Sequence, residues 1–230
     1  MNEEYVEQQV AQAVHHVYDK QHAQRAVDLD ILNEIAIPGQ IVFTGSSLMQ
    51  QFPINELLMT KKLPYVIYNR AISGYTTFDM LENMDKMVLA PKPSKVFINI
   101  GTNDVASAAI SNETMLENYE TILRKIKETL PDVVVYVMAY YPVNENGGRT
   151  QPDGPGASQS FVRRNNAVIN QVNEELRDLA DRMGCRYINV NEGLTDGEGR
   201  LRQDYSVEGI HMHASGYQVV LNNLLPYLAE

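Results

Sequence analysis

Short apolar runs alternate with amphipathic helical patterns along nearly the whole chain, and this alternation restricts the fold more than any other feature. The runs have the length of strands, and the β-branched run at 133–138 is typical of a central strand. Strands that alternate with helices form parallel sheets covered on both faces. The pattern therefore predicts an α/β protein, a three-layer α/β/α sandwich with a five-stranded parallel sheet, its strands at 41–43, 65–68, 95–100, 133–138 and 186–190.

Four longer segments carry the spacing of three and four residues that is typical of helices. They are 3–35, 113–130, 159–183 and 214–228. At 230 residues the chain fits one large domain better than two small ones. We therefore expect a single domain over 1–230, with residues 1–35 as an N-terminal helical extension.

Charge and cysteine content exclude several classes of function. Nineteen basic residues against 29 acidic ones give a net charge of -10, which argues against a nucleic-acid partner. The single cysteine, Cys185, excludes an internal disulfide, and no cysteine cluster has zinc spacing. The N-terminus has no apolar leader, and no apolar run approaches the ~20 residues of a membrane span. The expectation is a cytoplasmic protein without a membrane span, a metal or a cofactor.

Four polar clusters follow predicted strands. They occupy 44–48, 69–74, 101–104 and 208–211. Ligands of open α/β sheets bind at the carboxyl ends of the strands, so these clusters should converge on one crevice. Each cluster by itself is weak evidence for a functional site, because a Gly-Ser-Ser before a helix is more often a helix cap and a Gly-Thr-Asn-Asp is usually a turn.

Together the four clusters resemble the signature blocks of the SGNH hydrolases, the GDSL esterase/lipase family, and especially its platelet-activating-factor acetylhydrolase-like branch. The resemblance spans 41–217 and leaves 1–35 and 144–160 outside. It implies a flavodoxin-like SGNH hydrolase fold that needs no cofactor and acts on a small-molecule ester. It places the nucleophile on Ser47, the oxyanion-hole donors on Gly74 and Asn103, and the catalytic histidine on His211.

The chemistry of these residue types agrees with the resemblance. A serine hydroxyl is a poor nucleophile at neutral pH and needs a base within hydrogen-bond reach, for which histidine is the usual choice. The tetrahedral intermediate needs donors, and the backbone N–H groups of Ser47 and Gly74 and the Asn103 amide could supply them.

Two positions depart from the family pattern. The family usually has aspartate before the nucleophile and three residues before the histidine, whereas this chain has Ser46 and Glu208. We expect Glu208 to complete a triad with Ser47 and His211. Two alternatives stay open at this point, with Asp204 as the acid or with a Ser–His dyad supported by a backbone carbonyl.

The predicted function is that of a serine esterase that removes short acyl groups, acetyl foremost, from an alcohol, sugar or lipid oxygen. The alternative is a catalytically silent flavodoxin-like binding protein. Helix 3–35 could join two copies in a homodimer. The Gly- and Pro-rich stretch at 144–160 follows the fourth strand, so we expect it to cover the crevice and to shape the acyl-acceptor site.

Three further groups of residues receive weaker interpretations. The pair His211 and His213 has a spacing that could bind a metal, but alternate residues of an irregular segment diverge. Residues 15–16 are two histidines that are expected to be partly solvated. Arg163 and Arg164 are expected at a solvated helix start, with contact to an anionic or sugar substrate as the alternative.

Overall fold

The computed structural model describes residues 3–149 and 160–230, and it contains a sheet of five strands. Their order across the sheet is β2-β1-β3-β4-β5, and every neighbouring pair is parallel. The predicted five-stranded parallel sheet is therefore confirmed. The strands are β1 (Ile41–Gly45), β2 (Ile67–Asn69), β3 (Lys95–Asn99), β4 (Val134–Met138) and β5 (Arg186–Ile188).

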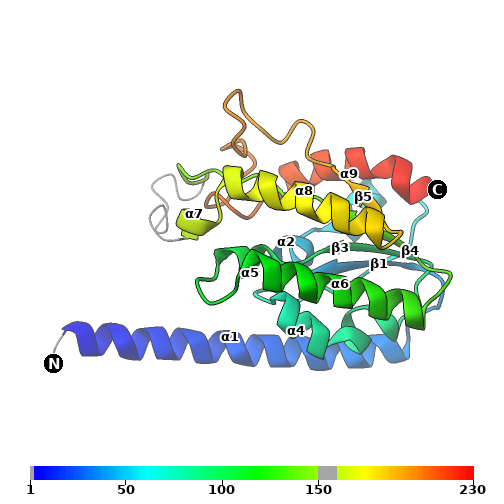
Figure 1. Cartoon of the computed structure of the whole chain (residues 1–230), viewed down its shortest axis with the longest axis horizontal. Coiled ribbons are helices and arrows are strands. Elements are labelled where there is room, and N and C mark those ends of the chain that lie inside the picture. The colour runs from blue at the N-terminus through cyan, green and yellow to red at the C-terminus, as the bar shows by residue number, and fades with distance from the viewer. Residues whose placement is uncertain (1–2, 150–159) are drawn as a thin grey trace.

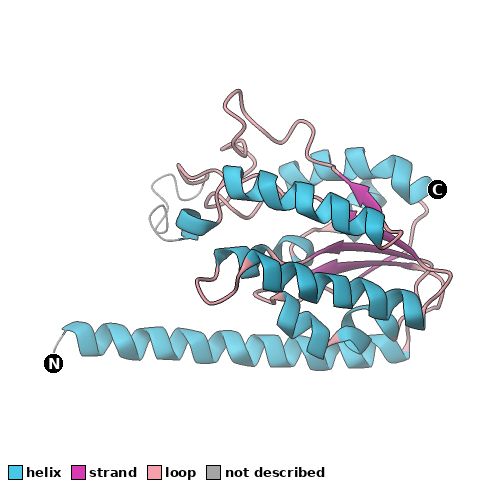
Figure 2. Ribbon diagram, in the orientation of Figure 1, coloured by secondary structure: helices cyan, strands magenta, loops and turns pink. Residues whose placement is uncertain are grey.

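Helices cover both faces of the sheet, as Figures 1 and 2 show. Successive residues of a strand point to opposite faces, so Val96 and Ile98 pack in one core and Phe97 in the other. The result is the predicted α/β/α sandwich. The first core lies under α1 (Glu3–Glu34), α4 (Thr77–Glu82), the π-helical η1 (Asp85–Leu89), α6 (Asn112–Thr129) and α8 (Asn166–Arg182), and the second under α2 (Ser47–Gln50), α3 (Ile54–Thr60) and α9 (Ala214–Ala229).

The single helix predicted over 159–183 is wrong at its start. Ser160–Arg163 forms the short α7, and α8 begins only at Asn166. The Asn165 side chain accepts a hydrogen bond from the Val168 N–H at 3.0 Å and so caps α8. The chain breaks here because Arg164, only 9% exposed, turns into the protein instead of continuing a helical surface. Residue 159 lies outside the described residues.

The predicted helix over 3–35 is present as α1, and its two ends differ in their surroundings. Near the C-terminal end, Ala26 and Leu29 belong to the first core, and Asp30 pairs with Lys86 of η1. The N-terminal end projects beyond the rest of the described chain (Figure 1). Across residues 3–149 and 160–230, no helix has the length and apolar character that crossing a bilayer would require.

The remaining boundaries shift by few residues. The strand predicted at 65–68 begins later, as β2, because the register with β1 pairs Ile67 with Ile41 and leaves Val66 exposed. The short α5 (Thr102–Ala106) follows β3 directly. It lies at the carboxyl edge of the sheet, where the polar clusters were expected to meet.

Candidate active site

Ser47, His211 and Glu208 form one hydrogen-bonded chain, although the serine lies 164 residues from the histidine in sequence. His211 Nε2 lies 2.9 Å from Ser47 Oγ. His211 Nδ1 forms a hydrogen bond with Glu208 Oε1. With the ring proton on Nδ1, the imidazole donates to the carboxylate and Nε2 accepts from the serine hydroxyl, which is the arrangement that activates a serine.

The close approach of β1 to β3 requires glycine immediately before the turn to this serine. Gly45 has φ +145°, and a Cβ there would lie 1.9 Å from the Asn99 carbonyl oxygen. Only glycine lets the chain leave β1 by this route. The turn then places Ser47 at the first position of α2, where a backbone N–H has no partner within the helix.

A tight turn returns the Glu208 carboxylate to His211. Gly209 has φ +106°, and its N–H donates to Ser206 Oγ at 2.6 Å. The His211 backbone N–H also donates to Glu208 Oε1, at 3.1 Å. Burial by itself favours the protonated acid, but the hydrogen bond and the charge of His211 outweigh it and lower the pKa of Glu208. The carboxylate is therefore ionised at neutral pH.

Asp204, the alternative acid, lies elsewhere. Its side chain is 56% exposed, and its carboxylate pairs with Arg202 at 2.8 Å. That hydrogen bond to Arg202 lowers the pKa of Asp204. The geometry thus brings Glu208, and not Asp204, to the histidine.

The three residues predicted to donate to the oxyanion, Ser47, Gly74 and Asn103, line one pocket. Within the described residues, the backbone N–H groups of Ser47 and Gly74 donate to no protein acceptor. Asn103 lies in α5 directly after β3 and lines the same pocket as both. Gly74 has φ +75°, so a side chain at this position would be strained. The three predicted oxyanion-hole residues are thus brought together beside Ser47.

Arg164 fixes the orientation of the Asn103 amide, a contact that the sequence interpretation missed. Its Nη2 donates to Asn103 Oδ1 at 3.0 Å and its Nε to the Thr102 carbonyl at 3.0 Å. Asn103 Nδ2 in turn donates to the Tyr75 carbonyl at 2.9 Å. The expected solvated helix start is therefore wrong for Arg164, whereas Arg163 is exposed. The buried charge of Arg164 is stabilised by two acceptors and by the nearby Glu208.

Asp104, the last residue of the third cluster, is not among the residues that line the pocket. Its buried carboxylate accepts hydrogen bonds from the Thr77 backbone N–H and hydroxyl. It therefore ties α5 to the start of α4. Burial raises the pKa of Asp104, although the bonds from Thr77 act in the opposite direction.

A pocket of about 570 Å³ opens onto these residues. It is built from parts of the chain that the sequence keeps far apart. Its lining comprises Gln21, His22, Arg25, Ser47, Gln50, Gln51, Ile72, Ser73, Gly74, Asn103 and His211.

Part of the Gly- and Pro-rich stretch at 144–160 contacts the segment that carries Glu208. The Asn144 N–H donates to the Gly209 carbonyl at 2.8 Å, and the Arg149 N–H donates to the Ser206 carbonyl at 2.7 Å. Residues 150–159 lie outside the described residues. The expected role of this stretch in shaping the acyl-acceptor site stays a prediction.

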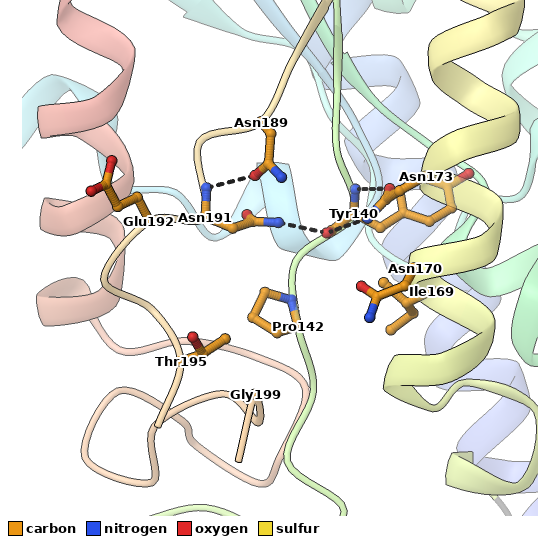
Figure 3. Close-up of a pocket in the computed structure, with 10 residues that line it drawn as sticks. All are labelled: Tyr140, Pro142, Ile169, Asn170, Asn173, Asn189, Asn191, Glu192, Thr195 and Gly199. Carbon is orange, nitrogen blue, oxygen red and sulfur yellow. Dashed lines mark hydrogen bonds between the residues drawn. The ribbon is translucent and has the colours of Figure 1, made fainter. Parts of the chain in front are cut away.

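A second pocket, of about 480 Å³, lies between α8 and the segment after β5 (Figure 3). It has several asparagines, two of which satisfy the backbone at the end of β4. Asn173 and Asn191 both donate to the Tyr140 carbonyl, and Asn173 also accepts from the Tyr140 N–H. Among the described residues, its lining has no serine and no histidine. It is therefore not a second candidate for a serine-centred site.

The metal site considered for His211 and His213 has no support from the geometry, because both ring nitrogens of His211 are hydrogen-bonded to Glu208 and Ser47. In the part of the chain that the structure describes, no group of three or more histidine, cysteine, aspartate or glutamate side chains is arranged to bind a metal. His16 is exposed. The side chain of residue 15 lies outside the description.

Comparison with known proteins gives a family match. The model of the GDSL-like Lipase/Acylhydrolase family matches residues 56–219, a range that begins after Ser47 and includes Gly74, Asn103, Glu208 and His211. A curated relative, N-acylneuraminate cytidylyltransferase of Escherichia coli O18:K1:H7, is 24% identical over 193 residues. The match covers 84% of this chain but only 41% of that protein.

Solved structures share the fold. The structure of a proposed platelet activating factor from Streptococcus pneumoniae is 29% identical, with a TM-score of 0.84 and coverage of 96% of this chain and 98% of the other. A proposed acylhydrolase from Bacteroides fragilis is 19% identical, with a TM-score of 0.70 and coverage of 86% of this chain and 92% of the other. An acetyl xylan esterase is 19% identical, with a TM-score of 0.64 over 82% and 99%. Since the family model covers well over half of its length, this chain belongs to the GDSL-like lipase/acylhydrolase family, the SGNH ester hydrolases.

Proposed function

We propose that this chain hydrolyses esters of short acyl groups, acetyl foremost, on an alcohol or sugar oxygen, through an acyl-enzyme on Ser47. The observation that carries the proposal is the hydrogen-bonded chain from Glu208 through His211 to Ser47. It opens onto a pocket whose wall also holds Gly74 and Asn103.

In the first half of the reaction, His211 Nε2 takes the hydroxyl proton as Ser47 Oγ attacks the ester carbonyl carbon. The carbonyl oxygen becomes an oxyanion and accepts hydrogen bonds from the N–H groups of Ser47 and Gly74 and from Asn103 Nδ2. The Glu208 carboxylate stabilises the imidazolium formed at this step. The intermediate collapses as the C–O bond to the alcohol breaks, and His211 returns the proton to the departing oxygen.

In the second half, water replaces the alcohol. His211 removes a proton from the water as its oxygen attacks the acyl carbon of the acyl-enzyme. The same three donors stabilise the second oxyanion, and the bond to Ser47 Oγ breaks as the serine regains its proton. The net change is ester plus water to carboxylic acid plus alcohol, with the enzyme restored.

The pocket lining supports a short acyl group and a polar acceptor. Among the described residues that line it, Ile72 has the only aliphatic side chain, and every other residue except Gly74 has a polar one. A long acyl chain gains binding energy of about 0.8 kcal/mol for each CH₂ buried against apolar surface, and Ile72 is the one aliphatic side chain among the described residues of this lining. The structural likeness to an acetyl xylan esterase is in keeping with an acetylated sugar, and it is a likeness of fold.

The test compares hydrolysis of 4-nitrophenyl acetate and 4-nitrophenyl octanoate by the wild type, Ser47→Ala and Ser46→Ala. Ser46 is the matched control, since it is adjacent and buried and its hydroxyl has no hydrogen-bond partner in the described structure. We expect the acetate to be preferred, Ser47→Ala to be inactive, and a sulfonyl fluoride to modify Ser47 in the wild type and in Ser46→Ala. Labelling at another residue, with full activity in Ser47→Ala, would contradict the nucleophile assignment.

The homodimer stays a prediction of the sequence. Val27 and Ile31 of α1 are 50% and 57% exposed, as an unpaired contact surface would be. Sedimentation equilibrium of the full chain would give twice the chain mass for a dimer and the chain mass for a monomer.

A further inference from the structure

Helix α1 forms one wall of the pocket that contains Ser47. Gln21, His22 and Arg25 line this pocket together with the serine and His211. The sequence interpretation placed residues 1–35 outside the hydrolase blocks, as an extension. In the structure the same helix reaches the site at which the substrate would bind.

His22 lies directly over the oxyanion-hole glycine. A Cβ on Gly74 would be 2.8 Å from His22 Cε1. The ring also packs edge-on against Tyr75, with 5.7 Å between ring centroids. Residues three apart share a face of a helix, so Arg25 enters the pocket beside His22. The side chains of α1 are therefore next to the donors that face the ester carbonyl.

One edge of the Arg25 guanidinium binds the protein. Nη2 donates to the Asn69 carbonyl at 3.0 Å and Nε to the Ala71 carbonyl at 3.4 Å. These carbonyls belong to the segment that leads to Gly74. Within the described residues, Nη1 makes no hydrogen bond and Arg25 forms no ion pair. The edge formed by Nη1 and the second N–H of Nη2 is the fork that binds a carboxylate through two parallel hydrogen bonds.

The surrounding charges favour an anion at this edge. Among the described residues, no acidic side chain lines the pocket, and Arg25 is its one permanently charged group. Asp28, whose charge acts on Arg25, lies one turn along α1 and accepts a hydrogen bond from Gln24 at 2.8 Å. Arg70 adds a second positive charge close by. A chain with a net charge of -10 repels anions at a distance, so an anionic ligand needs such a local cation.

We propose that Arg25 is a specificity residue that binds a carboxylate on the alcohol portion of the ester. The proposal rests on the proposed function and names the substrate class of the same site, namely esters of hydroxy acids. Arg25 takes no part in proton transfer, because the hydrogen-bonded chain at Ser47 is complete without it. Its effect therefore belongs to binding of the substrate.

The experiment uses 4-acetoxybenzoate and its methyl ester, which differ in the charge of one group remote from the scissile bond. The value of kcat/KM for each is divided by the rate of its hydroxide-catalysed hydrolysis, so that leaving-group reactivity cancels. The proteins are the wild type, Arg25→Gln, Arg25→Lys and Lys86→Gln. Lys86→Gln is the matched control, since it also removes one positive charge beside α1 but does not line the pocket.

We expect the wild type and Lys86→Gln to prefer the carboxylate by about 10- to 100-fold, the range that one charge-assisted hydrogen-bonded contact supplies. Arg25→Gln reduces both rates if the segment at Asn69 shifts, but the ratio falls to near one, and the change appears in KM. Arg25→Lys keeps part of the ratio. The wild-type ratio also decreases as the ionic strength rises. A wild-type ratio of one or below, or an equal ratio in Arg25→Gln, overturns the proposal.

A binding measurement separates this proposal from the proposed function. Ser47→Ala and Ser47→Ala/Arg25→Gln are titrated with 4-acetoxybenzoate and with its methyl ester, and chemical shifts are followed by NMR. If the wild type hydrolyses neither ester but Ser47→Ala binds the carboxylate in a way that Arg25→Gln abolishes, the esterase proposal fails and the Arg25 proposal stands. If the methyl ester is hydrolysed and the carboxylate gains nothing from Arg25, the reverse holds.

Discussion

Replacement of Glu208 by glutamine tests how the acid supports His211. Glutamine keeps the shape of the side chain and loses its charge. In other triads a carboxamide in this place rotates, donates to the imidazole and holds it in the wrong tautomer, which lowers kcat by about 10⁴. Here the Glu208 oxygen bonded to Nδ1 also accepts the His211 backbone N–H, at 3.1 Å. An amide nitrogen cannot accept from that N–H, so the glutamine side chain of the variant would keep its oxygen toward the ring.

The expected loss is therefore that of the charge alone. Opposite charges about 4 Å apart at an effective dielectric constant of 20 interact by about 4 kcal/mol. At about 1.4 kcal/mol for each tenfold change, partial screening at this part-exposed site gives a decrease of roughly 10²–10³ in kcat/KM for Glu208→Gln. Glu208→Ala also loses the hydrogen bond that holds the tautomer, so its activity should be lower still. Glu208→Asp restores the residue that is usual in the family and should keep substantial activity.

Steady-state hydrolysis of 4-nitrophenyl acetate measures the series, with circular dichroism to establish folding. Asp204→Asn is the matched control, because it makes the same charge change at an exposed carboxylate four residues earlier that pairs with Arg202. We expect it to retain wild-type kcat/KM. Full activity in Glu208→Gln would remove Glu208 from the triad. A glutamine variant less active than the alanine variant would show that the amide rotates, and the argument from the shared oxygen would be wrong.

Three further predictions concern α5 and the residue that orients it. Asn103→Ala should lower kcat by roughly 10²–10³ with little change in KM, as expected for a donor used in the transition state, and a change confined to KM would contradict that role. Arg164→Met frees the Asn103 amide to rotate, so kcat should decrease by up to that same factor, and an unchanged kcat in the folded variant would refute the positioning role. The loss of one buried and one part-buried hydrogen bond should lower the free energy of unfolding, measured by urea denaturation, by about 2–4 kcal/mol. The pKa of Asp104 is raised in the folded state, so its contribution to stability is full below its unfolded pKa and is lost as the pH rises through the folded pKa. From about pH 4 upward the wild type should therefore lose stability relative to Asp104→Asn. Urea denaturation at a series of pH values measures this, and a free energy of unfolding that changes equally with pH in the two proteins would disprove it.

The family and the fold could be predicted from local properties of the chain. Strands and helices leave periodic patterns of apolar residues, and a parallel sheet brings the residues that follow its strands to one edge. Ser47, Gly74, Asn103 and His211 each come after a strand or before a helix, so their convergence follows from the topology alone. Glu208 could be identified as a candidate acid although it departs from the family pattern, because a turn of three residues can return its side chain to His211.

Only the tertiary structure shows which acid lies against His211 and where the two arginines lie. Glu208 and Asp204 are both acidic and near His211 in sequence, and what separates them is the path of the turn at Gly209. The sequence predicts Arg164 as a solvated residue at the start of a helix. In the structure it is buried, because its guanidinium donates to Thr102 and Asn103, which lie 62 and 61 residues earlier in the chain. Arg25 reaches the pocket because α1 packs on η1, and its acceptors lie 44 and 46 residues further along the chain. Contacts between such distant segments leave no periodic trace in a single sequence, since they depend on how whole elements pack and not on the residues beside them.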